Sequence, residues 1–341
     1  YFTIMKKFTH AWLAFMAIKR LEYAAIPEIY DVHMVQKHAK SLVRWFKEYR
    51  DFVIEGSWYP DSIICDTGNS HGVKYTPGDL KKKKAFKPLP EHMEVYNFMK
   101  ENSKMYGKEF IIEGGNVCDR CEAMAHTLVD NFKIQYNSEK GNPIAPTNTH
   151  MALRFFMMSH YIADTHMPLH CDKRPFSGGH TIHAYIEDLW DSMIKQSYEI
   201  DTKNLRFYYD PKGYPLATKK MNEVMKEVEE KVINRPFQYD WGRSDYSTWD
   251  YMSAVSEYSY LLSWYMIPDV KTNDEVKELT REQFRESEGF KNLDKYSSMI
   301  FADAIDSIAR AWLHAWIRYR EWGPDKNSVL KKETTKKTET E

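Results

Sequence analysis

Apolar residues recur at helical spacing along most of this chain of 341 residues. In the first such segment Phe8, Trp12, Phe15 and Ile18 fall on one face of a helix, which is the pattern of an element with one buried side. Alternation typical of strands is scarce. The sequence therefore predicts an all-α fold made of a single multi-helix domain. We expect helices over residues 6–23, 32–53, 88–104, 118–137, 148–166, 180–198, 216–233, 248–267 and 293–321.

The predicted helices end near Gly323, and we expect one helical domain over residues 1–323. A hydrophobic content of 43% is enough for a large core that needs no disulfides. The remaining residues, 324–341, are charged and rich in threonine, so they predict a disordered tail with nothing to bury. Residues 54–87, 199–215 and 234–247 predict irregular segments, and the first is long enough to favour a functional role.

The formal net charge of -1 indicates neither a strongly basic surface for nucleic acid nor a highly acidic chain. No apolar run approaches the roughly 20 residues of a membrane-spanning helix. The segment from Ala11 to Ile18 superficially resembles a signal peptide, but its helical spacing favours an amphipathic first helix. A start at Met5 would predict a cytoplasmic protein, whereas Tyr1 is alternatively the end left by processing of a secreted one.

Cys118 and Cys121 lie one helical turn apart, among four cysteines in all. Four cysteines are too few to staple a chain of this length. The pair has no second Cys-x-x-Cys for a zinc ribbon and no strand-helix context for a redox motif. Inert helix residues and a local disulfide or metal role both remain open for this pair.

Histidines concentrate in one stretch, where the sequence HYIADTHMPLH contains His160, His166 and His170. His160 and Asp164 are four residues apart, which places both side chains on one face of a helix, as two ligands of one metal require. Pro168 ends this helix. His170 follows on the exit and is free to turn toward a second metal ion.

A second stretch, HTIHAYIEDLWD, repeats the spacing with His183 and Glu187. A single histidine four residues from an acid is more often a surface pair or a satisfied core residue. Two such pairs with a histidine between them, one pair in an apolar helix, favour a metal site because buried ionisable groups need partners. Imidazoles and carboxylates without thiolates suit zinc in a catalytic site.

These motifs resemble those of the bacterial zinc-dependent phospholipase C enzymes and the related fungal and plant zinc nucleases that cut single strands. The family pattern His-x3-Asp-x5-His is met by His160, Asp164 and His170. The following His-x3-Glu is met by His183 and Glu187. The sequence HMPLH resembles the nuclease branch, whereas Glu187 and the short interval before His183 resemble the phospholipase branch.

The likeness extends over about residues 5–321. The segment THAWLAF is similar to the family's N-terminal helix and makes His10 the matching ligand. The segment GSWYPDSI is similar to the family's Trp-Ala-Asp segment and makes Asp61 the matching carboxylate, with Asp66 a weaker candidate. In HGVKYTP the matching histidine is His71, at a shorter interval from Asp61 than the family shows.

The resemblance implies three zinc ions. It also implies a secreted protein whose first residue is a processed Trp, where this chain has Tyr1. The implied ligands are Asp61, His71, His160 and Asp164 for the first ion, His170, His183 and Glu187 for the second, and His10, Asp164 and the backbone of Tyr1 for the third.

The function implied by the resemblance is hydrolysis of a phosphodiester by a monomeric enzyme. Zinc-bound hydroxide would attack phosphorus in line, with Asp61 and Asp164 as catalytic residues, while the second zinc ion steadies the leaving oxygen. The substrate would be a phospholipid head group or single-stranded nucleic acid. The alternatives are a nuclease or nucleotidase of the same superfamily and a non-catalytic, zinc-stabilised helical protein. Tyr59, Tyr75 and Phe176 are candidates for pocket lining or for core packing.

Overall fold

The structure, a computed structural model, describes residues 6–23, 32–66, 69–77, 99, 110–174, 176, 181–237, 247–267 and 273–322. Within these ranges the chain is mostly helical and also contains two small antiparallel sheets. The prediction of a mostly helical domain is confirmed, and the strands are an addition to it. Tyr1, the tail expected over 324–341 and, apart from residue 99, the helix expected over residues 88–104 lie outside the described residues.

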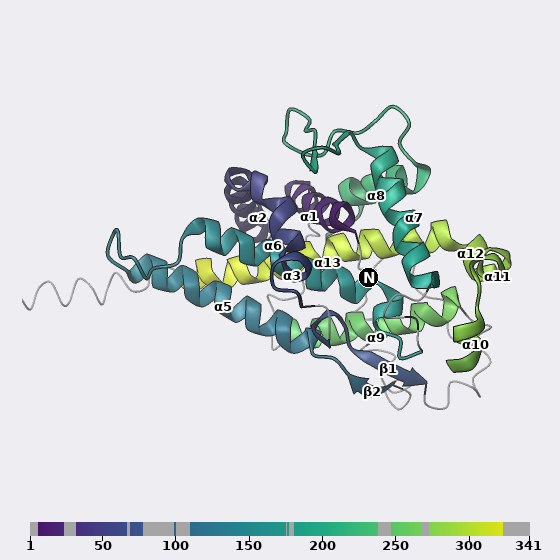
Figure 1. The fold of residues 1–341 in the computed structure, drawn as a ribbon. Coiled ribbons are helices and arrows are strands. Elements are labelled where there is room, and N and C mark those ends of the chain that lie inside the picture. Colours follow the sequence, from purple (N-terminus) through teal and green to yellow (C-terminus); the bar gives the residue numbers. More distant parts are fainter. Residues whose placement is uncertain are drawn as a thin grey trace, which may run out of the picture.

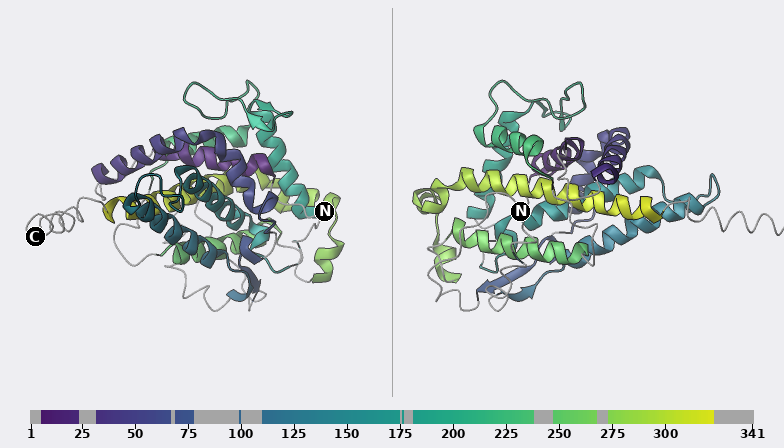
Figure 2. Two further views of the ribbon diagram at one scale, coloured as in Figure 1. Left: turned by 60° about the vertical axis from the view of Figure 1, so that its left-hand side comes forward. Right: turned by 180° about the vertical axis from the view of Figure 1, so that it is seen from behind.

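The bundle is arranged around one long helix, α13 (Leu293–Trp322). Figure 1 shows α13 in yellow between α1 above and α9 below, and the view from behind in Figure 2 agrees. The other longer helices are α1 (Lys7–Glu22), α2 (Val32–Glu48), α3 (Val53–Ser62), α5 (Val117–Asn137), α6 (Asn148–His166), α7 (Thr181–Ser197), α8 (Glu223–Asn234) and α9 (Thr248–Met266).

Shorter elements connect and flank these helices. Strands β1 (Lys74–Pro77) and β2 (Phe110–Gly114) pair with each other, as do β3 (Ile200–Asp201) and β4 (Arg206–Phe207). The helices α10 (Asn273–Glu278), α11 (Arg281–Glu286) and α12 (Glu288–Lys291) precede α13. Single 3-10 turns cover Arg50–Phe52, Asn69–His71 and Pro168–His170.

Aromatic side chains fill the core beside α13. Trp312 is buried, with its ring centroid 4.7 Å from that of Phe46 on α2. Its indole nitrogen donates to the carbonyl of Phe155 on α6 at 2.8 Å, so the one polar atom of a large apolar group is satisfied. The high aromatic content therefore serves packing between α2, α6 and α13.

Helix α3 corrects the prediction that residues 54–87 are irregular. Gly56 and Pro60 disfavour a helix on local grounds, yet both lie inside α3. A Cβ on Gly56 would lie 2.7 Å from the Cβ of Phe156 on α6, so glycine permits close packing of the two helices. Burial of α3 against α6 and α1 outweighs the local cost, and it places Asp61 inside the protein.

A buried charge cluster joins α1 to α13. The guanidinium of Arg20 donates to Asp306 at 2.6 Å and to the carbonyl of Val232 at 3.0 Å. Arg235, just after α8, bonds both Asp303 and Asp306. Each carboxylate is thus paired with a guanidinium, as buried charges require.

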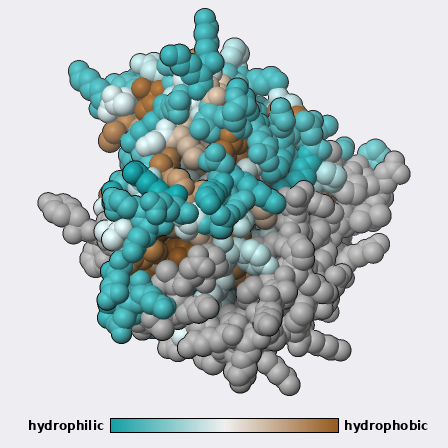
Figure 3. Space-filling model, turned by 90° about the vertical axis from the view of Figure 1, so that its right-hand side faces the viewer, coloured by the Kyte–Doolittle hydropathy of each residue, from teal (hydrophilic) through white to brown (hydrophobic). Residues whose placement is uncertain are grey.

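The surface visible in Figure 3 is mainly hydrophilic where it is coloured, with hydrophobic patches between the polar side chains. Among the described helices, none joins sufficient length to sufficient apolar character for a membrane crossing.

His166, at the end of α6, is buried with its Nε2 2.8 Å from the hydroxyl of Ser307. Burial lowers the pKa of His166 to about 3, whereas an exposed histidine has a pKa of about 6.5. The unfolded chain therefore binds a proton here at mildly acidic pH while the native protein does not. The stability that this neutral imidazole contributes is present above the unfolded pKa and is lost as the pH falls below it.

Replacing His166 with glutamine is expected to remove this pH dependence. The free energy of unfolding of the wild type, relative to His166→Gln, should fall by about 2 kcal/mol between about pH 7 and pH 5. Urea unfolding of both proteins at the two pH values measures the difference. Titration of the other histidines is common to both proteins and cancels, so a difference that stays constant with pH would contradict the prediction.

Candidate metal centre

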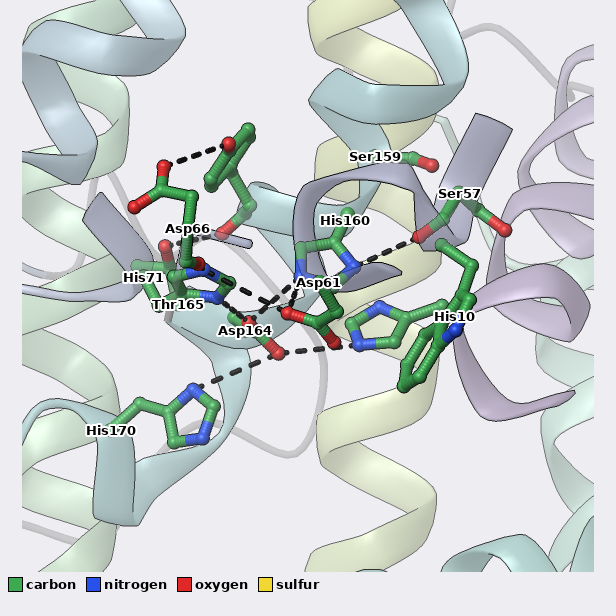
Figure 4. Close-up of polar contacts among 12 residues, drawn as sticks. His10, Ser57, Asp61, Asp66, His71, Ser159, His160, Asp164, Thr165 and His170 are labelled. Carbon is green, nitrogen blue, oxygen red and sulfur yellow. Dashed lines mark hydrogen bonds and ion pairs between the residues drawn. The ribbon is translucent and has the colours of Figure 1, made fainter. Parts of the chain in front are cut away.

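Imidazoles and carboxylates from six separate segments converge between α1, α3, α6 and α7. Figure 4 shows His10, Asp61, His71, His160, Asp164 and His170 lying close together and joined by ion-pair and hydrogen-bond contacts. His10 comes from α1, Asp61 from α3, and His160 and Asp164 from α6. His71 and His170 end 3-10 turns, and α7 supplies His183 and Glu187.

These residues form three groups, and within each group the ligand atoms lie within 4.8 Å of one another. Every predicted side-chain ligand belongs to one of them, while the predicted ligand Tyr1 lies outside the described residues. The first group is Asp61, His71 and His160; the second is His170, His183 and Glu187; the third is His10, His160 and Asp164.

Asp164 connects the three groups. One carboxylate oxygen lies 3.4 Å from Nε2 of His10 and 3.7 Å from Nδ1 of His170. The other lies 3.3 Å from Nε2 of His160 and also contacts Nδ1 of His71. Burial alone would raise the pKa of the Asp164 carboxyl, but His160, His170 and His10 hold it well below its usual range. The arrangement is one connected cluster rather than three isolated sites.

The backbone of α3 orients His160. Nδ1 of His160 donates to the carbonyl of Ser57 at 2.8 Å. This bond leaves Nε2 as the free nitrogen, 3.3 Å from oxygens of both Asp61 and Asp164. Histidines that bind metal commonly donate their other ring N–H to a carbonyl in this way.

The second group has the same design. Nδ1 of His183 donates to the carbonyl of Phe176 at 3.0 Å. Its Nε2 lies 2.9 Å from an oxygen of Glu187 and 3.1 Å from Nε2 of His170. Burial would raise the pKa of the Glu187 carboxyl, yet His183 and His170 lower it. Two imidazole nitrogens and a carboxylate therefore face one small space.

The segments that carry His71 and His170 are in direct backbone contact. A Cβ on Gly72 would lie 2.5 Å from the carbonyl oxygen of His170, so only glycine allows this approach. Beyond it, the amide of Tyr75 donates to the carbonyl of Cys171, and the amide of Lys173 donates to that of Tyr75, both at 3.0 Å. This Tyr75 bridge sets the first group beside the second.

Many of the facing atoms are buried and have no hydrogen-bond partner in the described parts of the chain. Such atoms cost free energy unless a partner satisfies them, and a divalent cation is that partner for imidazole nitrogen and carboxylate oxygen together. The residues therefore fit bound metal. The atoms are Nδ1 and Nε2 of His10, both carboxylate oxygens of Asp61, Nε2 of His160, Oδ1 of Asp164, Nδ1 of His170 and Oε2 of Glu187.

Protons compete with metal for these nitrogens. Burial alone would lower the pKa of His160, yet Asp164 and Asp61 raise it to about 10. Burial and the neighbouring His160 hold the pKa of His10 well below its ordinary value. The acids thus attract positive charge to the centre, which a metal ion supplies more compactly than several protonated imidazoles do.

Other candidates from the sequence lie elsewhere. The carboxylate of Asp66 is bonded to Arg120 and accepts from the Tyr161 hydroxyl at 3.0 Å, so it does not join the groups. Tyr75 and Phe176 are buried in the core, which favours the packing interpretation. Tyr59 is half-buried and contributes no atom to the groups.

Cys118 and Cys121 are free thiols buried on α5. Burial raises the pKa of the Cys118 thiol to about 12, so it is protonated at neutral pH and is a poor metal ligand. Neither cysteine belongs to a candidate group within the described residues. Of the two interpretations of the Cys-x-x-Cys pair, the inert one fits the structure.

Comparisons with known proteins identify no relative, so function is inferred from the geometry of the site. No family model matches the chain, and neither the curated proteins nor the solved structures give a match. What the chain itself shows is a mostly helical protein with three connected groups of His, Asp and Glu side chains that could hold metal ions.

Proposed function

We propose that this protein is a zinc-dependent hydrolase of phosphodiester bonds, of the phospholipase C and single-strand nuclease type. The observation that carries the proposal is that His160 belongs to two neighbouring groups and that Asp164 contacts histidines of all three. Shared ligands would bring cations close together, as in two-metal sites that stabilise the attacking and leaving oxygens of a phosphodiester. The motifs that resemble the superfamily supply the same residues in the same order along the chain.

The three groups indicate which side chains would hold each ion. Asp61, His71 and His160 with Asp164 would hold one ion, and the second group another. His10 and Asp164 would hold the third, together with Tyr1 as the resemblance implies. Bound zinc supplies positive charge that neutralises phosphate oxygens and makes water acidic enough to react near neutral pH.

The chain's own residues orient the metal-binding nitrogens and accept protons. The carbonyls of Ser57 and Phe176 fix the rings of His160 and His183, so that their Nε2 atoms face the acids. Burial raises the pKa of Asp61, which strengthens its carboxylate as a proton acceptor. One oxygen of Asp61 is enough to bind a cation, which leaves the other to accept a hydrogen bond from the attacking water. Asp164 keeps its negative charge between the histidines.

We infer that substrate approaches the cluster past its two least buried histidines. The side chains of His71 and His170 are 11% and 12% exposed, whereas those of His10, His160 and Asp164 are fully buried. We call the His71 and His170 side the open edge. A partly accessible edge on a carboxylate-rich site without thiolates favours catalysis over a purely structural metal site. Phospholipid head groups and single-stranded nucleic acids both present the required phosphodiester.

Replacing His170 with alanine is expected to lower zinc content and to reduce the rate on bis(4-nitrophenyl) phosphate by about a hundredfold or more. The second group then loses one of its two imidazoles, and Asp164 loses a neighbour. Elemental analysis of the purified protein and initial rates measure the two effects. His126→Ala removes an exposed histidine of α5 and is the matched control.

A folded His170→Ala protein that keeps wild-type zinc content and rate would sink the ligand assignment. Wild-type protein is assayed in parallel on a phosphatidylcholine analogue, single-stranded DNA, RNA and phosphomonoesters. Zinc-loaded protein that is inactive on all of them would favour the non-catalytic alternative.

A further inference from the structure

A guanidinium lies beside the His71 end of the open edge. Arg120 belongs to α5, which supplies no residue to the three groups. Its Nη2 bonds the carboxylate of Asp66 and donates to the Tyr161 hydroxyl at 3.0 Å. The carbonyl of Asp66 contacts the His71 ring, whose centroid is 5.4 Å from that of Tyr161. Arg120 is therefore separated from the first group by a single layer of residues.

This guanidinium retains donors that its neighbours do not use. Arginine carries five N–H donors, and the bonds of Arg120 within the described residues engage Nη2. Its Nε is buried without a partner in that same part of the chain. Nε is closed to solvent, but the side chain as a whole is 36% exposed, which leaves the two N–H groups of Nη1 for an anion.

A purely structural ion pair accounts for only part of this arrangement. Asp66 and Tyr161 bind one end of the guanidinium and hold it at 4.9 Å from the Tyr161 ring. An ion pair that only links α5 to the segment of His71 would need no further N–H donor. Both N–H groups of Nη2 are engaged by Asp66 and Tyr161, so the two N–H groups of Nη1 remain to donate charge-assisted hydrogen bonds to a phosphate oxygen.

We propose that Arg120 binds an anionic phosphate oxygen of the substrate at the open edge, next to the first group. The inference rests on the proposed phosphodiesterase function and assigns a substrate-binding residue outside the metal ligands. Asp66 and Tyr161 hold the guanidinium in place, so little side-chain entropy is lost when the substrate binds. The recognised chemistry is a phosphate oxygen, either on the reacting phosphate or on its neighbour in an oligonucleotide.

The test compares Arg120→Met and Arg120→Lys with the control Arg154→Met, all in zinc-loaded full-length protein. Arg154 is an arginine of α6 that bonds exposed His150. Calorimetric titration with inorganic phosphate is expected to show a Kd about tenfold higher or more in Arg120→Met. KM for bis(4-nitrophenyl) phosphate should rise similarly while kcat changes less. Arg154→Met should match the wild type.

Zinc content separates this role from a structural one. Arg120→Lys keeps a cation for Asp66 but has no second nitrogen to donate to phosphate, so it should retain zinc and still bind phosphate more weakly. Wild-type phosphate affinity in either variant, or zinc loss in both, would overturn the proposal. A wild type that hydrolyses phosphodiesters shows that such a failure is confined to Arg120.

A single-stranded oligonucleotide locates the bound oxygen. If Arg120→Met raises KM more for the oligonucleotide than for bis(4-nitrophenyl) phosphate, Arg120 binds the neighbouring phosphate. An equal rise places it at the reacting phosphate. No rise for either substrate contradicts the inference.

Discussion

Replacing Asp164 with asparagine is expected to lower zinc content and to reduce the proposed phosphodiesterase activity by about a thousandfold or more, equivalent to about 4 kcal/mol. Asp164 contacts all of the histidines in the first and third groups and also His170. Asparagine keeps the shape but removes the negative charge, and it offers an amide N–H₂ in place of one oxygen. Elemental analysis and kcat on bis(4-nitrophenyl) phosphate give the two measurements.

The matched control is Asp188→Asn, which changes a partly exposed acid on α7 that pairs with Lys6. This variant should retain both zinc and activity. If Asp164→Asn also retained both while remaining folded, Asp164 would not be the connecting ligand and the shared-ligand argument would fail.

Replacing Asp306 with alanine is expected to destabilise the protein by about 3–5 kcal/mol, because it leaves a buried positive charge without its partner. Arg20 is fully buried and loses the carboxylate that now lies 2.6 Å away. Arg235 loses one of its two acids and retains Asp303. Urea unfolding monitored by circular dichroism measures the change.

Asp294→Ala is the control for this substitution, since Asp294 is an exposed acid in the first turn of the same helix. It should cost no more than about 1 kcal/mol, the usual size of a helix-dipole contribution. An Asp306→Ala protein as stable as this control would show that the cluster contributes little to the native state.

Strong local patterns made much of the helical architecture predictable. The helix expected over residues 148–166 is observed as Asn148–His166, with the Thr147 side chain accepting from the backbone at its start. Apolar spacing, a capping residue and Pro168 agree there. Helix α3 could not be predicted, because Gly56 and Pro60 favour a break and burial against α6 and α1 outweighs that preference.

The candidate site divides in the same way. His160 with Asp164 and His183 with Glu187 follow from a four-residue spacing on helices. His10 lies on another helix, far away in the sequence, so the family resemblance alone placed it with them, as it also did Asp61 and His71. The carbonyls that orient the imidazoles carry no sequence signal, because every residue has one.

The Tyr75 bridge makes the centre indivisible. Since β1 and the segment after His170 share backbone hydrogen bonds, and Gly72 lies against His170, the position of His71 depends on that of His170. A transplant of α6 and α7 into another helical bundle would carry the two four-residue motifs but not this junction. A design that reuses this centre must therefore include β1 together with α6 and α7.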